Sequence, residues 1–340
     1  MKNWKNKFEK LAAVLGMAVC VMTFSAPATS LAQSPARLDK MVVAGWSKPI
    51  TEITNLLVEE DKGFFKARGI ELGYVPGAGG GDALRNLLSG QADVAFTDPG
   101  SFFATLDKGE KLRAIYDIYP QNVFNVVSLK SANIGKPADL KGKRIGVYSL
   151  SSGTRQNLQV LLHQAGLSES DVTVVVTGLL NFAPLMQGQV DATAATDTGL
   201  LVGKQRGLGD VNVIEVKNHL NISSDFFVVR EESYEKKKEV LKRFLLAYRD
   251  SAEWMIRSPD EAAKLAVKYA IDGQNPAINL EIIKLRNLSS VSANTQKNGL
   301  GSFDILSLQK GAQAYKAFGV IQRDIKVSDV VSQDLLPGKR

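Results

Sequence analysis

A short segment of this 340-residue sequence occurs twice. Leu87–Asp93 reads LLSGQAD, and Leu185–Asp191 reads LMQGQVD. Each copy has the pattern of a helix that ends at a glycine, and an apolar run follows it. Each run then ends in the same dipeptide, Thr97–Asp98 in the first copy and Thr196–Asp197 in the second. The repeat therefore predicts two lobes of similar build, each with a Thr-Asp pair at the carboxyl end of a core strand.

The chain as a whole alternates short apolar or β-branched runs with helical patterns, which predicts an α/β fold with parallel sheets covered by helices on both faces. Open parallel sheets bind ligands beyond the carboxyl ends of their strands. Two such sheets facing each other predict a hinged clamp around a solute. In the mainly helical last third, the apolar period from Val240 to Ile256 predicts one long helix. The predicted strands are Met41–Ala44, Glu71–Val75, Val94–Thr97, Leu112–Ile118, Phe124–Leu129, Arg144–Tyr148, Val172–Val176, Ala192–Ala195 and Val211–Val216.

The first 32 residues have the plan of a secretory signal peptide. Four lysines precede the uncharged apolar stretch Leu11–Phe24, and Ser30–Ala32 offers small residues at the cleavage positions. We therefore expect residues 1–32 to be removed and the mature chain to begin at Gln33, in the periplasm. Cys20 is the only cysteine. Because the apolar stretch continues past it, we expect a freely diffusing protein and not a lipid-anchored one.

Charge and composition exclude several classes of function. The net charge of +7 includes four lysines and one glutamate of the signal, so the mature chain carries only about +4. This charge is too small and too evenly spread to indicate a nucleic-acid partner. The two histidines, His163 and His219, have no cysteine partners, and no nucleophile elbow or metal cluster is present. We expect no enzymatic activity, no metal site and no cofactor.

Three longer motifs occur together in this chain. They are Asp61–Leu72 (DKGFFKARGIEL), Leu88–Ala95 (LSGQADVA) and Asp139–Val147 (DLKGKRIGV). Together they resemble the substrate-binding proteins of nitrate, sulfonate, taurine and thiamine-pyrimidine importers, and the resemblance extends from about residue 40 to about residue 230. It implies the two-lobed type II periplasmic-binding-protein fold, with a ligand cleft between the lobes. It also implies two chain crossovers, one near Leu129 and one near Ser223–Phe226.

The resemblance implies a first lobe of residues 33–128 and 225–340 and a second lobe of residues 129–224. It implies an extracytoplasmic, monomeric solute-binding component of an ABC transporter, which delivers a small organic solute to the membrane permease. Sulfonate-like or taurine-like, aromatic carboxylate and pyrimidine-like solutes all remain open, because Ala195–Gly199 departs from the aromatic-acid-proline run of sulfonate receptors. A receptor of a tripartite carrier is the alternative. An enzyme on the same fold is a third reading, but the cysteine- and histidine-rich segments of thiamine-pyrimidine synthases are missing here.

Candidate ligand-binding residues follow predicted strands, where loops open on the cleft. Trp46 and Ser47 follow the first strand, and an exposed tryptophan can stack on a planar ligand. Gly79 and Gly80 lie in a glycine-rich turn whose backbone amides can bind an anion at a helix start. The alternatives are a tryptophan of the lobe core and a plain flexible turn.

The other candidates are polar residues at predicted helix starts. After the strand that ends at Tyr148, hydroxyls, free amides and one guanidinium converge at a helix start, which predicts an anion pocket. The four residues of the two Thr-Asp pairs can accept hydrogen bonds from amino or ring N–H groups of a ligand. Ordinary helix capping is the alternative for both sets. These candidates are Ser151, Ser152, Gly153, Thr154 and Arg155 in the pocket, and Thr97, Asp98, Thr196 and Asp197 in the pairs.

Overall fold

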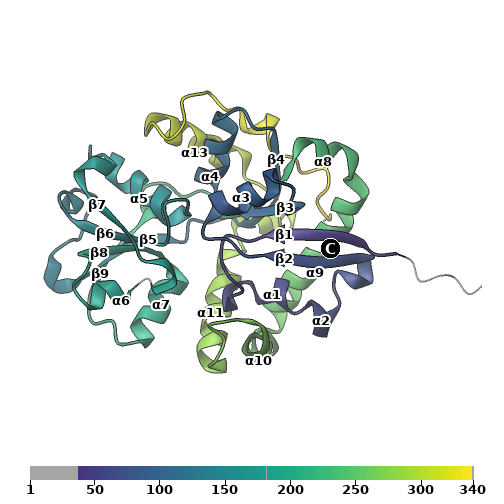
Figure 1. Cartoon of the computed structure of the whole chain (residues 1–340), viewed down its shortest axis with the longest axis horizontal. Helices are drawn as coiled ribbons and strands as arrows, with labels where there is room; N and C mark the ends of the chain where they lie inside the picture. The colour runs from purple at the N-terminus through teal and green to yellow at the C-terminus, as the bar shows by residue number, and fades with distance from the viewer. Residues whose placement is uncertain (1–36, 181, 339–340) are drawn as a thin grey trace, which may run out of the picture. The chain divides into compact units, whose positions relative to one another are not determined.

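The computed structural model describes residues 37–180 and 182–338, and it contains two five-stranded sheets (Figure 1). The predicted signal peptide, its cleavage site and Cys20 lie outside the described residues. We call the parts of the chain that build the first and second sheets the first and second lobe. None of the helices in the described part of the chain is long and apolar enough to span a membrane.

The first lobe contains the sheet with strand order β2-β1-β3-β10-β4. Strands β1, β2 and β3 are parallel, and β10 runs antiparallel to both β3 and β4. Its strands are β1 (Asp39–Ala44), β2 (Ile70–Val75), β3 (Val94–Thr97), β4 (Leu112–Tyr119) and β10 (Asp225–Arg230). Its helices are α1 (Thr54–Leu57), α2 (Glu59–Lys62), α3 (Gly80–Leu88), α4 (Pro99–Asp107), α8 (Glu231–Lys236), α9 (Lys238–Arg257), α10 (Pro259–Tyr269), α11 (Pro276–Ser289), α12 (Ala293–Asn298) and α13 (Ile305–Ala317).

The second lobe repeats this plan with strand order β7-β6-β8-β5-β9. Strands β6, β7 and β8 are parallel, and β5 runs antiparallel to β8 and β9. The predicted α/β fold with two similar lobes is therefore confirmed. Its strands are β5 (Phe124–Leu129), β6 (Arg144–Val147), β7 (Thr173–Val176), β8 (Ala192–Thr196) and β9 (Val211–Glu215), and its helices are α5 (Gly153–Gln164), α6 (Ala183–Met186) and α7 (Asp197–Gln205).

The sequence repeat corresponds to one structural unit in each lobe. Gly90 and Gly188 both adopt the left-handed conformation, with φ of 78° and 70°, which a residue without a Cβ adopts at little cost. The aspartate that ends each copy then joins its strand to the first parallel strand of its lobe. Asp93 Oδ2 accepts a hydrogen bond from the Val42 amide at 3.0 Å, and Asp191 Oδ2 accepts one from the Arg144 amide at 2.8 Å.

Two features of the sheets differ from the prediction. Each sheet contains one antiparallel strand, and the first crossover occurs at residues 120–123, before β5 and not near Leu129. The segment 124–128 therefore belongs to the second lobe. Since only residues 120–123 separate the two strands, β5 begins in the second sheet close to where β4 ends, and it runs antiparallel to β8 and β9. The second crossover ends where β10 begins, at Asp225, as predicted.

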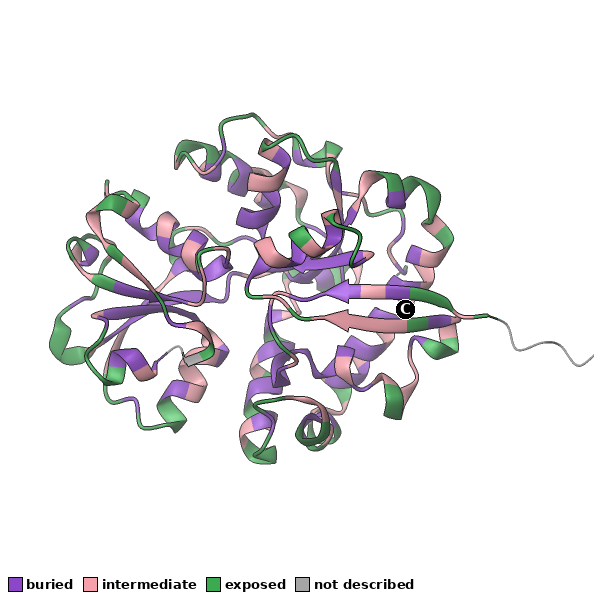
Figure 2. Cartoon of the chain, viewed as in Figure 1, coloured by how far each residue is buried: buried purple, intermediate pink, exposed green. Residues whose placement is uncertain are grey.

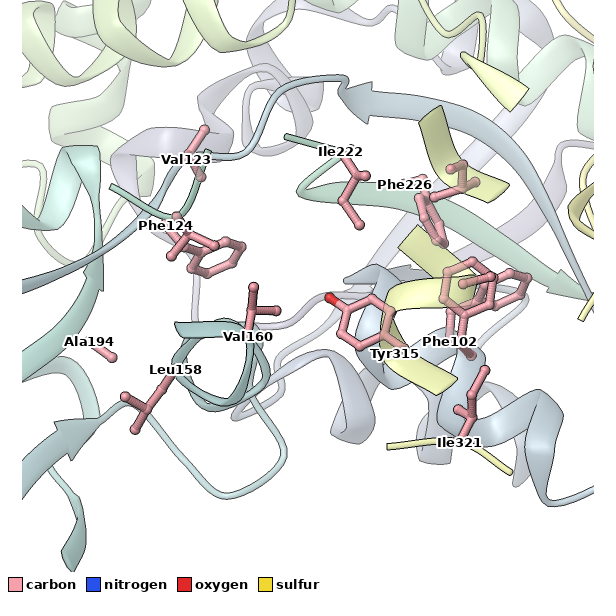
Figure 3. Packing of buried hydrophobic residues seen from close by; sticks show 14 of the residues in the cluster. Phe102, Val123, Phe124, Leu158, Val160, Ala194, Ile222, Phe226, Tyr315 and Ile321 are labelled. Atoms are coloured by element: carbon pink, nitrogen blue, oxygen red, sulfur yellow. The ribbon is translucent and has the colours of Figure 1, made fainter. Parts of the chain in front are cut away.

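The hydrophobic core continues from one lobe into the other on one side of the molecule. A single cluster of buried residues includes Val160 of α5 in the second lobe and Phe102, Phe226 and Tyr315 in the first lobe. Figure 3 shows Val160 and Tyr315 facing each other across the junction. Buried residues also follow the central strands of both sheets (Figure 2). The lobes are therefore joined by apolar packing as well as by the two chain crossovers.

The long helix predicted in the last third is present as α9, and it packs on the first sheet. Phe227 of β10 is fully buried, and its ring lies 5.3 Å from the ring of Phe244 and 4.6 Å from that of Tyr248. The 3.6-residue period of apolar residues thus reflects burial of one face of α9 against the sheet.

Candidate functional site

A cleft of about 390 Å³ lies where the carboxyl ends of the parallel strands of both sheets meet. Trp46 and Asp98 reach it from the loops after β1 and β3 of the first lobe, and Tyr148 and Thr196 from the ends of β6 and β8 of the second. A cavity of this size accommodates a small organic molecule. The ligand cleft that the fold implied is therefore present.

Eight of the thirteen candidate residues line this cleft, and five do not. The loops after the strands end at the cleft as expected, but neighbouring residues in a loop or helix start point in different directions. The lining residues are Trp46, Gly79, Gly80, Asp98, Ser152, Gly153, Thr154 and Thr196, and those outside the lining are Ser47, Thr97, Ser151, Arg155 and Asp197.

The predicted anion pocket lacks its cation. Arg155 follows the cleft-lining Thr154 by one position in α5, and its guanidinium points away from the cleft. Its Nε pairs with Glu169 Oε1 at 2.9 Å, and its Nη1 donates to the Leu150 carbonyl at 3.0 Å. The hydroxyls of Ser152 and Thr154 form a hydrogen bond with each other, with 2.7 Å between Oγ and Oγ1. Arg155 therefore does not meet a ligand in this arrangement.

The glycine-rich turn is occupied by protein contacts. The Gly79 amide donates to the Trp46 carbonyl at 2.7 Å, and the Gly81 amide donates to the Ser151 carbonyl of the second lobe at 3.0 Å. Gly79 has a φ of 125°, and a Cβ at this position would collide with the Ser151 backbone. The turn thus forms a close contact between the lobes, and the amides of Gly79 and Gly81 already donate to protein carbonyls.

Two further candidates are buried in the first lobe. The Ser47 hydroxyl donates to the Lys48 carbonyl at 2.7 Å, and the Ser47 carbonyl accepts a hydrogen bond from Tyr74 at 2.8 Å. Thr97 is fully buried at the end of β3. Both residues are buried beneath the residues that line the cleft, and neither lines the cavity itself.

The two Thr-Asp pairs use different members to cap their helices. In the first pair, Asp98 caps α4 and accepts hydrogen bonds from the Ser101 amide at 2.9 Å and its hydroxyl at 2.8 Å. In the second pair, Thr196 caps α7 by accepting from the Gly199 amide at 3.2 Å. Capping was the alternative interpretation of these residues, and it holds for both. Asp98 and Thr196 nevertheless also face the cleft.

Three buried carboxyl groups of the first lobe line the cleft, those of Asp98, Asp225 and Glu52. Burial raises the pKa of Asp98 to about 6, against the hydrogen bonds from Ser101. Burial raises the pKa of Asp225 well above its usual range, and the charge of Asp98 adds to this effect. Glu52 also lines the cleft, and its burial raises its pKa while Arg286 opposes the shift. A solute that brings N–H donors or positive charge would relieve this desolvation.

Asp225 and Arg286 are cleft residues that the sequence analysis missed. Asp225 begins β10 directly after the second crossover, so the predicted crossover near residues 223–226 was a signal for it. Arg286 comes from α11, in the helical last third, where the sequence offers no signal beyond an amphipathic pattern. Its side chain is only 1% exposed, and its guanidinium lies 4.8 Å from the ring centroid of Tyr119.

Aromatic rings from both lobes contribute to the walls. Trp46 of the first lobe and Tyr148 of the second meet edge to face, with ring centroids 6.5 Å apart at an interplanar angle of 89°. Phe124 and Phe182 of the second lobe also line the cavity. Flat aromatic surfaces of this kind favour a planar ligand.

The charges of the described lining residues favour a solute that is not an anion. Four carboxyl groups line the cleft, and the two cations are Arg206 and Arg286. Arg286 already forms ion pairs with Glu52 at 2.8 Å and with Asp197 at 3.1 Å. The buried cation of the lining is thus neutralised by protein groups.

The fold and the cleft define this chain as a two-lobed protein with the fold of the periplasmic binding proteins. Its structure is similar to that of the alkanesulfonate-binding protein SsuA from Xanthomonas axonopodis pv. citri bound to MOPS. The TM-score is 0.69 at 18% identity, and the match covers 89% of this chain and 100% of that chain. The sequence profile of the family described as "NMT1/THI5 like" matches residues 50–262, and the chain belongs to this family.

Several relatives of the chain are named as binding proteins. The chain is 22% identical over 338 residues to the riboflavin-binding protein RibY of Chloroflexus aurantiacus, covering 96% of both. It is 22% identical over 269 residues to the formylaminopyrimidine-binding protein of Halalkalibacterium halodurans, covering 78% of this chain and 81% of that protein. One relative is named as an enzyme, the 4-amino-5-hydroxymethyl-2-methylpyrimidine phosphate synthase of Schizosaccharomyces pombe. It is 23% identical over 227 residues, covering 63% of this chain and 65% of that protein.

Proposed function

We propose that this protein is a periplasmic receptor that captures a planar, nitrogen-containing heteroaromatic solute and delivers it unchanged to an ABC importer. The observation that carries the proposal is the pairing of aromatic walls with buried carboxyl groups in one cleft. Trp46 and Tyr148 supply flat surfaces, while Asp98 and Asp225 supply acceptors for ring or amino N–H groups. The names of the pyrimidine-binding and flavin-binding relatives agree with this chemistry.

A sulfonate fits this cleft less well than a heteroaromatic base. A sulfonate keeps its negative charge at any physiological pH, so it would have to displace Glu52 or Asp197 from Arg286. A sulfonate group also offers acceptors only, so it would leave the carboxyl oxygens of Asp98 and Asp225 without N–H donors. The pyrimidine-like branch of the three predicted ligand classes is therefore the one we propose.

The experiment that tests the proposal is a thermal-shift screen of the mature protein. The heteroaromatic arm contains 4-amino-5-hydroxymethyl-2-methylpyrimidine, formylaminopyrimidine and riboflavin, and the anionic arm contains taurine and MOPS. A solute at a hundredfold excess over its dissociation constant should raise the unfolding free energy by about 2.7 kcal/mol. We expect shifts in the heteroaromatic arm alone. A shift produced only by sulfonates would contradict the proposal.

Tryptophan fluorescence gives an independent measure of binding in the cleft. The sequence has three tryptophans, and Trp4 lies in the predicted signal, so the mature protein retains Trp46 and Trp254. Only Trp46 lines the cleft, whereas the Trp254 Nε1 donates to Glu261 at 2.8 Å in the first lobe. A stacked heteroaromatic solute should quench the emission of the wild-type protein. Trp46→Phe should abolish most of this quenching, and the control Trp254→Phe should retain it.

The location in the periplasm rests on the predicted signal peptide. The protein purified from the periplasmic fraction should begin at Gln33 or within a few residues of it, as measured by N-terminal sequencing. A mature chain that begins at a lipidated Cys20 would instead indicate a membrane-anchored receptor.

Reconstitution with a permease and its ATPase, compared with a tripartite carrier, would identify the transporter class.

A further inference from the structure

One edge of the cleft is bridged by side chains from both lobes. Arg286 of α11 in the first lobe donates through Nη2 to Thr198 Oγ1 at 2.8 Å and to Asp197 Oδ1 at 3.1 Å, both at the start of α7 in the second lobe. The Thr198 hydroxyl also donates to Glu52 of the first lobe. We call these four side chains the latch.

The latch is buried, although it joins two parts that are expected to move apart. The exposed fraction of the side chain is 1% for Arg286 and 11% for Glu52, and Thr198 as a residue is 1% exposed. Charge-assisted hydrogen bonds are strong in such surroundings, because water does not compete for the donors. Asp197 is more exposed, at 28%. Separation of the lobes would break the contacts of Arg286 with Thr198 and Asp197 and leave its contact with Glu52 intact.

The latch uses only one of the three nitrogens of the Arg286 guanidinium. All of the hydrogen bonds described above use Nη2, and neither Nε nor Nη1 has a partner among the described residues. The closed form thus gains only the few bonds that one nitrogen of Arg286 makes to Thr198 and Asp197, and a bound solute can shift the balance between the two states.

We infer that Arg286 is a positioning residue for solute capture, which acts through Thr198 and Asp197 to hold the lobes closed. Together with Thr198 and Asp197 it sets the balance between the closed and the open cleft. The inference goes beyond the proposed function and does not depend on the chemistry of the solute. It does require that the latch breaks when the cleft opens and forms when it closes.

Distance measurements on the solute-free protein test this inference directly. The described residues contain no cysteine, so two cysteines can be introduced for nitroxide labels. Lys204 of α7 and Lys284 of α11 are exposed residues of the two latch helices, one in each lobe. Pulsed electron paramagnetic resonance then gives the distribution of open and closed distances. A substitution of Arg286 itself would leave Glu52 and Asp197 unpaired and could prevent folding, so the test variant changes the second-lobe side of the latch.

The test variant is the double substitution Asp197→Asn and Thr198→Val, and the matched control is Asp191→Asn. Asp191 is also in the second lobe and pairs with an arginine, but Arg144 belongs to the same lobe. We expect the wild type and the control to show a short-distance population. The double variant should lose it, with a closed-to-open ratio lowered by about tenfold or more. Equal distributions in the double variant and the wild type, or a wild type without short distances, would overturn the inference.

Discussion

Replacing Asp225 with asparagine should weaken solute binding by about two orders of magnitude and leave the protein at least as stable as the wild type. Asp225 lines the cleft, and none of the residues that the structure describes donates a hydrogen bond to its carboxylate. Its acceptors are therefore free for the N–H groups of a solute. An asparagine offers one acceptor in place of two and turns an N–H group toward the solute. Because burial raises the pKa of Asp225 well above its usual range, the wild-type carboxylate is costly in the empty cleft.

Titration calorimetry with a solute from the thermal-shift screen measures this effect. Asp272→Asn is the matched control, since Asp272 also lines the cleft but accepts hydrogen bonds from the amide and the hydroxyl of Thr51, both at 2.8 Å. The control should change the dissociation constant by less than about threefold, which corresponds to well under 1 kcal/mol. Unchanged affinity in the Asp225 variant would remove this residue from the site, and equal losses in both variants would point to a general effect of charge.

Replacing Asp117 with asparagine should remove a large part of the pH dependence of stability. Asp117 lies in β4 and is 1% exposed, and its Oδ2 accepts a hydrogen bond from Ser223 at 2.7 Å. Burial raises its pKa to about 8, against the hydrogen bond from Ser223. In the unfolded chain the carboxyl ionises near pH 4. Between these two values the folded state holds a proton that the unfolded state has lost, so the wild type loses stability as pH rises from about 4 to about 8.

The asparagine variant cannot lose this proton, so it should exceed the wild type in unfolding free energy by about 3 kcal/mol more at pH 8 than at pH 4. A rise in pKa from about 4 to about 8 would by itself correspond to about twice this free energy. We expect roughly half, because the protein around a buried carboxylate relaxes and admits water when the group ionises. Burial also raises the pKa values of Asp98 and Asp225, so the dependence of the unfolding free energy on pH should become weaker in the variant without disappearing. Urea denaturation at several pH values measures this dependence.

Asp191→Asn is the control of opposite sign for this experiment. The Arg144 guanidinium lowers the pKa of Asp191, so its contribution to stability is present above about pH 4 and is lost as pH falls below that. This variant should therefore differ from the wild type by more at pH 7 than at pH 3. An Asp117 variant with the same pH profile as the wild type would show that Asp117 is ionised or solvated in the folded protein.

The sequence alone determined the elements and their repetition. The boundaries of β3 and β5 agree with the predicted runs to the residue, and α9 extends the predicted helix by two residues at its amino end and one at its carboxyl end. Such patterns are local, because the period of apolar residues follows from the geometry of one strand or helix. The repeated segment added one long-range fact, the similarity of the two lobes. It also placed Asp98 and Thr196 at the ends of core strands, where they reach the cleft.

Only the tertiary structure decided which strand joins which sheet and which polar side chains meet. The apolar run of β5 would suit either lobe, and in the structure it pairs with β8 and β9 of the second sheet. Arg155 had every local sign of an anion ligand, yet it points to Glu169 on the outer side of α5. Arg286 had none, yet the packing of α11 brings it to Glu52 and Thr198. These side chains lie far apart in sequence, and their encounter depends on how two lobes close on each other, which no local pattern encodes.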